Sequence, residues 1–217
     1  MSRHSLSRRT FLAGTTLAGL ATVAGRGVLV PTVWAAAVAK VGEAAPGFTT
    51  TATTNKGVSL ADQRGKIVIL EWTNHDCPYV RKHYESGNMQ TLQKEITGQG
   101  VIWLTLISSS PGTQGYVTPK QADELTSTRK ANPTAVLLDP TGVVGRAYGA
   151  TNTPHMYVID KSGLLVYAGA IDDRPTTRPS DVPVAHNYVR AALDDMAAGR
   201  PVQTPVTRAY GCTVKYA

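Results

Sequence analysis

Cys77 has the clearest chemical potential in the sequence, because it stands where a helix is expected to begin. The apolar run 67–72 is typical of a buried strand, the polar loop 73–76 follows it, and a helix opens at Pro78. Backbone N–H groups at a helix N-terminus favour a thiolate over a thiol. A thiolate is the nucleophile of thiol–disulfide exchange. We therefore predict that Cys77 is an accessible, reactive thiol, with an inert buried thiol as the alternative.

The second cysteine, Cys212, lies near the end of the sequence. We expect it to form a disulfide with Cys77, either as a resolving cysteine in a reversible bond or as one half of a permanent one, with an unpaired Cys212 as the remaining alternative. Closing so long a loop would stabilise the fold by roughly 4–5 kcal/mol if chain entropy dominates. Both readings of the disulfide require the end of the chain to reach Cys77.

Glu71 interrupts the apolar run that leads to Cys77. A carboxylate is costly to bury, so a buried Glu71 is expected to have a raised pKa and could exchange a proton with the reacting thiol. The alternative is a strand-end position beside solvent or Lys66.

Histidines surround the same segment. His75 and His83 flank Cys77, and His155 follows Pro154. Together with the thiol they could hold a soft metal such as Cu(I) or Zn(II). The alternative is that they only lower the pKa of the thiol when protonated. Our main interpretation includes no metal site and no cofactor.

Residues 1–39 have the pattern of an export signal. Arg8 and Arg9 precede the moderately apolar run 11–25, and small residues before Val38 and Lys40 offer cleavage sites. This pattern is typical of a twin-arginine signal peptide, so we expect a periplasmic or secreted protein. The apolar run is too short and weak to span a bilayer well, which argues against stable membrane insertion after cleavage.

The predicted signal also explains part of the charge. The formal net charge is +7, and residues 1–39 contain four arginines and no acidic residue, which leaves +3 for residues 40–217. No block of Lys and Arg remains, so a nucleic-acid partner is not expected. The compartment beyond the cell membrane permits disulfides.

Residues 40–217 are enough for one domain with a substantial core. Strands and helices alternate, which predicts an α/β fold with a central mixed sheet and helices on both faces. A hairpin extension precedes the first central strand, and an irregular C-terminal tail, residues 202–217, ends the chain. The expected strands are 48–53, 58–60, 67–72, 101–108, 135–138, 156–159 and 164–167, and the expected helices are 78–96 with a kink near 86–88, 119–131 capped by Thr118, 143–148 and 184–198.

This order of elements resembles the thioredoxin fold in its redoxin, or peroxiredoxin-like (AhpC/TSA-type), branch. The resemblance covers nearly all of residues 40–217 and depends on four landmarks. It implies that Pro154 is a cis-proline packed against Cys77, and that Glu71 stands where thioredoxins have a buried carboxylate. It also implies that Thr153, Pro154, Pro78 and Tyr79 meet the substrate. The landmarks are the segment 77–80, Thr153-Pro154 before the strand 155–160, the segment 145–149, and Glu71.

Three positions depart from the family patterns. Thioredoxins have a second cysteine where this chain has Val80, so Cys77 lacks the usual resolving partner. Peroxiredoxins have Thr or Ser where this chain has Asn74, and Pro where it has Leu70. The chain therefore resembles the peroxiredoxin-like group with a single thioredoxin-type cysteine.

We accordingly expect a thiol-dependent oxidoreductase in which Cys77 is the nucleophile and Cys212 resolves the product. Its partner would be a protein thiol or disulfide. A thiol peroxidase acting on small peroxides and a redox-inactive or copper-binding module are the alternatives.

Overall fold

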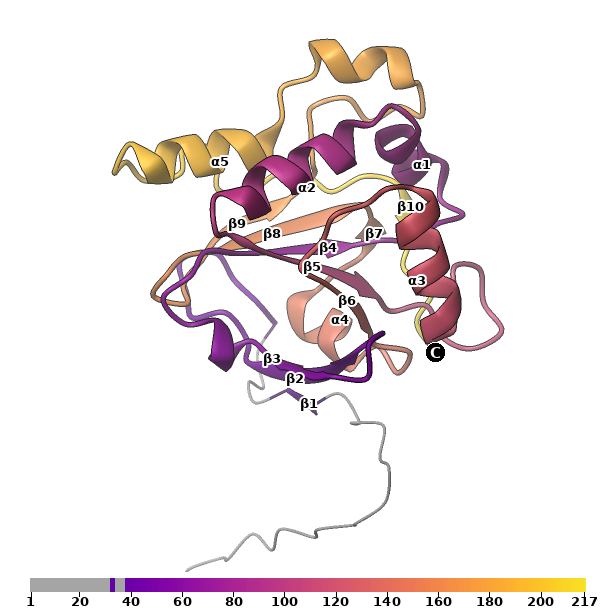
Figure 1. Ribbon diagram of the computed structural model, residues 1–217. Coiled ribbons are helices and arrows are strands. Elements are labelled where there is room, and N and C mark those ends of the chain that lie inside the picture. Colours follow the sequence, from indigo (N-terminus) through magenta and orange to yellow (C-terminus); the bar gives the residue numbers. More distant parts are fainter. Residues whose placement is uncertain (1–31, 34–37) are drawn as a thin grey trace, which may run out of the picture.

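The computed structural model describes residues 32–33 and 38–217 (Figure 1). Most of the predicted signal, 1–39, therefore lies outside the described residues. In the described part, eight strands form one sheet in the order β1-β2-β6-β5-β4-β8-β9, with β3 paired to β2. The strands of this sheet are β1 (Thr32–Val33), β2 (Phe48–Ala52), β3 (Gly57–Ser59), β4 (Val68–Trp72), β5 (Ile102–Ile107), β6 (Ala135–Leu138), β8 (His155–Ile159) and β9 (Leu165–Gly169).

The strand that leads to Cys77 lies in the middle of the sheet. β4 pairs in parallel with β5 and antiparallel with β8, and β5 pairs in parallel with β6. All five residues of β4 and of β8 are buried, as a nearly continuous apolar run predicts. The prediction of a mixed sheet is confirmed.

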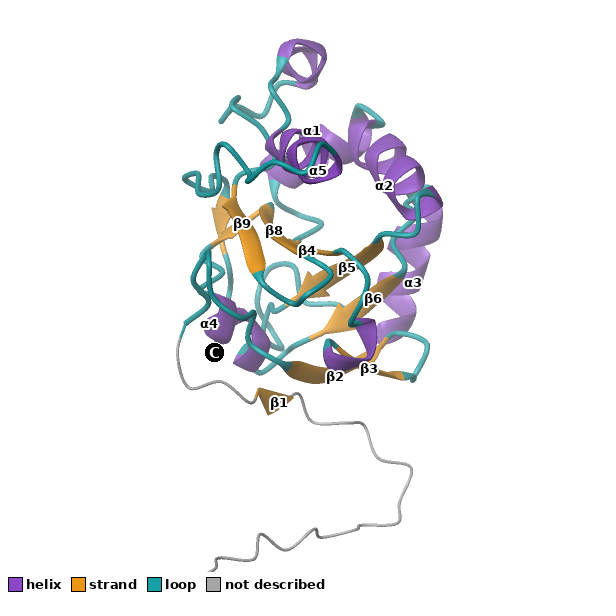
Figure 2. Ribbon diagram, turned by 90° about the vertical axis from the view of Figure 1, so that its left-hand side faces the viewer, coloured by secondary structure: helices purple, strands orange, loops and turns teal. Residues whose placement is uncertain are grey.

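Helices cover both faces of the sheet (Figure 2). α1, α2 and α5 pack on one face, where Val80, Met89 and Val189 join Ile69 and Trp103 in one apolar cluster. α4 packs on the other face through Val144 and Tyr148, against Leu70 and Trp72. The helices are α1 (Pro78–Glu85), α2 (Asn88–Gly98), α3 (Pro119–Thr128), α4 (Val143–Tyr148) and α5 (Tyr188–Ala197), with short 3-10 helices η1 (Ala61–Gln63) and η2 (Pro179–Val184).

Local signals account for several boundaries. Thr118 caps α3, accepting a hydrogen bond from the Gln121 N–H, as predicted. The expected kink near 86–88 is a complete break, because Gly87 adopts a left-handed conformation between α1 and α2. The last helix begins at Tyr188 rather than 184, because Pro179–Val184 forms η2 instead.

The tail is more ordered than the sequence predicts. Within it, β10 (Cys212–Thr213) pairs antiparallel with β7 (Asn152–Thr153), a short strand just before β8. Figure 1 shows the two strands, labelled β10 and β7, beside the end of α1 that carries Cys77. The pairing brings the C-terminal tail to the residues that directly precede Pro154.

Candidate active site

Cys77 occupies the N-cap position of α1. Pro78 is the first helical residue. An N–H at this position has no partner within the helix, so a proline there costs no hydrogen bond. The loop before it is closed by Asn74, whose carbonyl accepts from the Cys77 N–H at 3.1 Å and whose side chain accepts from the Asp76 N–H at 2.9 Å. The strand, loop and helix thus fix the thiol at a helix N-terminus, as predicted.

Thr153 and Pro154 lie against this thiol. The Thr153–Pro154 peptide bond is cis, which confirms the prediction from the resemblance. The sulfur of Cys77 is 3.1 Å from the carbonyl oxygen of Thr153, to which the protonated thiol donates. This carbonyl therefore favours the protonated thiol, and any stabilisation of the thiolate must come from other groups.

Those other groups come largely from Cys212. It lies opposite Thr153 in the β10–β7 pairing, and its backbone N–H is 3.4 Å from the Cys77 sulfur. The Cys212 thiol also hydrogen-bonds to Cys77. Both cysteines are free thiols. The tail thus reaches Cys77, which both sequence-based readings of the disulfide require.

The two thiols differ in acidity. Burial raises the pKa of Cys77, but hydrogen bonds from the Cys212 thiol and from the backbone N–H groups of Val80 and Cys212 outweigh it, so this pKa is below the ordinary value. Burial, followed by the hydrogen bond and charge of Cys77, raises the pKa of Cys212 to about 12. Cys77 is therefore the thiol that ionises first, and Cys212 is its proton-bearing donor.

Cys77 is nevertheless not accessible, contrary to the sequence-based expectation. Its exposed fraction is 0%, because Tyr79, Tyr210 and Cys212 complete the apolar cluster around it. Two of these three residues belong to the tail. A large partner can reach the sulfur only after the tail moves.

The part of the chain that contains Cys77, Thr153 and Pro154 matches a known family. The chain matches the AhpC/TSA family over residues 41–168, more than half of its length. It belongs to the AhpC/TSA family. A search of curated proteins found no significant match.

Solved structures share the fold of the chain. An uncharacterised conserved protein from Geobacillus kaustophilus is 26% identical, with a TM-score of 0.73 over 87% of this chain and 97% of that one. A hypothetical protein from Sinorhizobium meliloti is 24% identical, with a TM-score of 0.68 over 82% and 95% of the two chains. A candidate protein disulfide isomerase from Bacteroides thetaiotaomicron is 19% identical, with a TM-score of 0.53 over 77% and 93%, and shares the fold. The AhpC/TSA domain of this chain thus has the thioredoxin-like fold.

Glu71 is completely buried in this AhpC/TSA domain, so its placement beside solvent or Lys66 is wrong. Burial raises its pKa, while hydrogen bonds from its neighbours oppose the rise. In the described part of the chain, no hydrogen bond joins Glu71 to Cys77, and the carboxylate instead connects α1, α2 and β5. The donors to its two oxygens are Tyr84, Gln93, Trp103 and Thr105.

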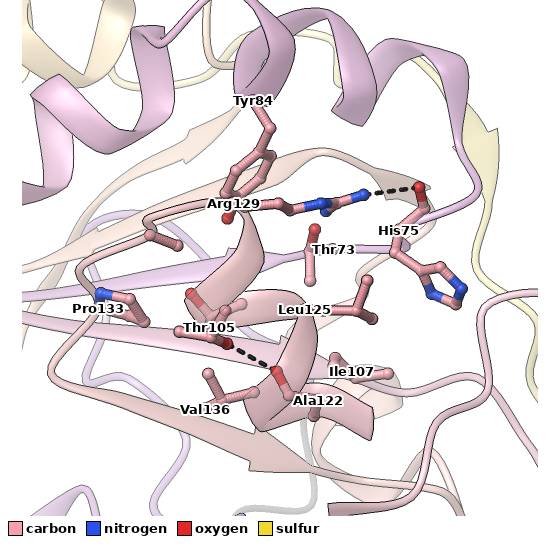
Figure 3. Close-up of a pocket in the computed structure, with 12 residues that line it drawn as sticks. Thr73, His75, Tyr84, Thr105, Ile107, Ala122, Leu125, Arg129, Pro133 and Val136 are labelled. Carbon is pink, nitrogen blue, oxygen red and sulfur yellow. Dashed lines mark hydrogen bonds between the residues drawn. The ribbon is translucent and has the colours of Figure 1, made fainter. Parts of the chain in front are cut away.

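A small cavity of about 40 Å³ lies between this network and the loop before Cys77. Figure 3 shows Tyr84 and Thr105 in its wall together with Thr73, and shows Arg129 donating to the carbonyl oxygen of His75. The hydroxyl of Thr73 is buried there without a protein partner within the described residues. The cavity has room for a water molecule beside the Thr73 hydroxyl, although its lining is mostly apolar.

The three histidines are not brought together. The His83 ring lies between Asn88 and Tyr210, and the His155 ring stacks on Tyr157 with centroids 4.6 Å apart. Burial lowers the pKa of both to about 4, so neither is a cation near neutral pH. Over residues 38–217, no three His, Cys, Asp or Glu side chains are grouped to hold a metal ion. The structure therefore gives no support to the copper-binding alternative.

Sequence reasoning missed a buried charged cluster behind Cys77. Lys82 is 1% exposed, with its ammonium nitrogen 3.4 Å from the Asp172 carboxylate and 2.7 Å from the Arg174 carbonyl oxygen. The Tyr210 hydroxyl donates to the same carboxylate. The signal in the sequence was the charged run 172–174, which belongs to no helix or strand pattern.

Proposed function

We propose that this AhpC/TSA-family protein is an exported thiol–disulfide oxidoreductase with Cys77 as nucleophile and Cys212 as resolving cysteine. The observation that carries the proposal is the position of Cys212, whose backbone N–H lies 3.4 Å from the Cys77 sulfur in a strand paired with β7. A thiol with a lowered pKa next to a second free thiol has the arrangement that exchange requires.

The reaction proceeds in two exchanges. The Cys77 thiolate attacks one sulfur of a partner's disulfide, the partner's S–S bond breaks, and the leaving thiolate takes up a proton. Cys212 then loses its proton and attacks the Cys77 sulfur, which forms the Cys77–Cys212 disulfide and releases the partner's second thiolate. The partner gains two electrons, and an external dithiol returns the protein to its reduced state.

The high pKa of Cys212 suits this order of events. Part of its rise comes from the hydrogen bond and charge of Cys77, after the larger effect of burial. Once Cys77 is bound in a mixed disulfide, it carries no charge and this part of the rise disappears. Movement of the tail removes burial as well. Cys212 therefore becomes a better nucleophile only after the partner is bound.

The residues around Cys77 have separate roles in this proposal. Thr153 and Pro154 offer backbone to the substrate, since the Thr153 carbonyl already binds the thiol. Pro78 and Tyr79 form the first turn of α1 on the same side of the sulfur. Glu71 handles the proton through the hydroxyl groups of Tyr84 and Thr105 and the adjoining cavity rather than by direct contact.

The compartment follows from the first residues of the sequence. The paired arginines at 8 and 9 and the apolar run after them favour twin-arginine export to the periplasm or beyond, where disulfides persist. None of the helices in residues 38–217 is long and apolar enough to cross a bilayer. A thiol or disulfide partner protein in that compartment is the proposed substrate.

A thiol peroxidase is the second candidate, favoured by the family assignment. In that reaction the Cys77 thiolate would attack one peroxide oxygen, the O–O bond would break, and a sulfenic acid and water or an alcohol would form. Peroxiredoxins have a hydroxyl side chain at the position of Asn74, and Asn74 has an amide there. The side chain of Asn74 holds the loop instead: its oxygen accepts from the Asp76 N–H, and its nitrogen lies 3.4 Å from the Gln114 carbonyl oxygen. Thiol exchange therefore remains the first candidate.

The test compares the wild type with Cys212→Ala and Cys77→Ala. The wild type, treated with a small disulfide, is expected to lose two hydrogens and to yield a Cys77–Cys212 cross-linked peptide in mass spectrometry. Cys212→Ala is expected to accumulate the mixed disulfide, and Cys77→Ala to form none. An equally persistent mixed disulfide in the wild type would exclude Cys212 as resolving cysteine. Faster capture of a sulfenic acid with hydrogen peroxide than of the mixed disulfide would favour the peroxidase.

A further inference from the structure

The tail behaves as a peptide bound to the domain. From Pro205 it runs beside Ala168, and β10 then lies along β7 next to Pro154. Two further hydrogen bonds hold the backbone of the tail. The Asn152 side chain donates to the Gly211 carbonyl oxygen at 2.9 Å, and the Val214 N–H donates to the Thr151 carbonyl oxygen at 3.0 Å. Pairing of an extended segment with a short exposed strand is a recurring mode of peptide recognition.

An aromatic side chain anchors this segment. The ring of Tyr210 packs against Tyr79 with centroids 5.8 Å apart, and the Lys82 ammonium lies 5.5 Å from its centre. Its hydroxyl donates to Asp172 and lies 3.2 Å from the His83 ring nitrogen. Lys82, His83 and Asp172 are all buried, so they form a fixed socket for one aromatic ring and its hydroxyl.

A glycine separates this anchor from the cysteine. Gly211 has φ +112°, and a Cβ there would collide with the Thr153 carbonyl oxygen. The close approach of tail and β7 thus requires a glycine between the aromatic residue and the cysteine. A surface hollow of about 570 Å³ beside Asp172 and Tyr188 adjoins the segment, so a longer chain has room to continue.

We propose that the groove formed by Tyr79, Lys82, Asn152, Thr153 and Asp172 is a docking surface for an extended polypeptide that presents an aromatic residue two positions before the reacting cysteine. In the structure, residues 209–213 of the tail occupy this groove. The inference rests on the proposed function in taking Cys77 as the reacting sulfur. A partner binds by replacing the tail, which then returns to bring Cys212 back to Cys77.

The test uses full-length protein carrying Cys212→Ser, in which Cys77 is the sole thiol. Gly211→Ala is added to displace the tail, and Gly199→Ala is the matched control, since Gly199 also has positive φ but has open space around it. Alkylation of Cys77 by iodoacetamide is expected to be about tenfold faster with Gly211→Ala, because the fraction of molecules with an open groove rises. The control is expected to react at the parent rate.

The second measurement is binding. A fluorescent peptide of residues 207–215 with serine in place of Cys212 is expected to bind the Gly211→Ala protein about tenfold more tightly than the parent, because it no longer competes with the tail. Peptide binding is expected to be lost when Tyr210 of the peptide is replaced by alanine. Tyr210→Ala in the protein provides a second way to loosen the tail if Gly211→Ala does not fold.

Two results would overturn the proposal: unchanged alkylation in both loosened variants, or an opened Cys77 without peptide binding. The second would mean that the tail is a cover and the groove is not a docking surface. Binding of the serine peptide involves no sulfur chemistry, so it succeeds or fails independently of thiol exchange. Cys77→Ser, which abolishes exchange, is expected to leave this binding intact.

Discussion

The backbone N–H of Cys212 lies 3.4 Å from the sulfur of Cys77, although 135 residues separate the two in the sequence. In the usual thioredoxin pattern the second cysteine stands three positions after the first, on the same helix. Here that position is Val80, and the second thiol comes from a strand in the tail. The acidity and the accessibility of Cys77 therefore both depend on the tail as well as on α1.

Replacing Cys212 should change the acidity of Cys77. Cys212→Ala removes a thiol that donates to the Cys77 sulfur, so the pKa of Cys77 should rise toward its ordinary value. Cys212→Ser keeps a donating hydroxyl and should retain most of the lowered pKa. The measurement is the alkylation rate of Cys77 against pH. Identical midpoints for the two variants would contradict the role given to this hydrogen bond.

Val80→Cys should move the disulfide. Val80 is buried in the first turn of α1, and its backbone N–H stabilises the Cys77 thiolate. A thiol at this position is held on the same helix and needs no movement of the tail, so it should capture Cys77 before Cys212 does. Peptide mapping after mild oxidation would show which bond forms. With Val80→Ala as the control, the Cys77–Cys212 bond should persist, and its persistence in Val80→Cys would refute the expectation.

Glu71→Gln should destabilise the fold. All four groups bonded to Glu71 donate, and an amide nitrogen placed among them would face a donor and leave a buried group unsatisfied. The expected loss is about 2–4 kcal/mol of unfolding free energy. Denaturant titration measures it, with the exposed Glu95→Gln as a control of small effect. Equal midpoints for the two variants would show that this network contributes little.

Stability should fall in mildly acidic solution because of His83 and His155. Burial lowers the pKa of each to about 4, while an unfolded histidine titrates near 6.5. Above pH 6.5 both states are neutral. As the pH falls toward 4, only the unfolded chain binds the protons, so each histidine removes up to about 3 kcal/mol of unfolding free energy.

Unfolding free energies between pH 7 and pH 4 test this dependence. His83→Gln and His155→Gln should each make the fall with pH less steep, and the exposed His186→Gln should leave it unchanged. An identical pH dependence in all three variants and the wild type would count against burial of the two rings as the cause.

The sequence predicts the central architecture well because its signals are local. The continuous apolar run of β4 and the Pro78 that opens α1 determine where Cys77 stands, without any knowledge of distant contacts. The cap at Thr118 is equally local. The family resemblance added Pro154, whose cis peptide bond no local pattern specifies.

What the sequence does not predict depends on contacts between distant segments. The β10–β7 pairing involves two residues on each strand, too few to create an alternating pattern. The burial of Lys82 depends on Asp172, which is 90 positions later in the sequence and follows the edge strand β9. A lysine on a helix is ordinarily exposed to solvent, so the sequence alone does not indicate that Lys82 is buried.

The position of the last residues has a practical consequence for work with the protein. Arg146 donates to the carbonyl oxygen of Ala217 at 2.6 Å and lies over the ring of Tyr216, so the very end of the described chain is docked on the domain. A purification tag fused after Ala217 would be attached to the same tail that covers the sulfur of Cys77. A tag for assays of Cys77 is therefore better introduced in an exposed loop.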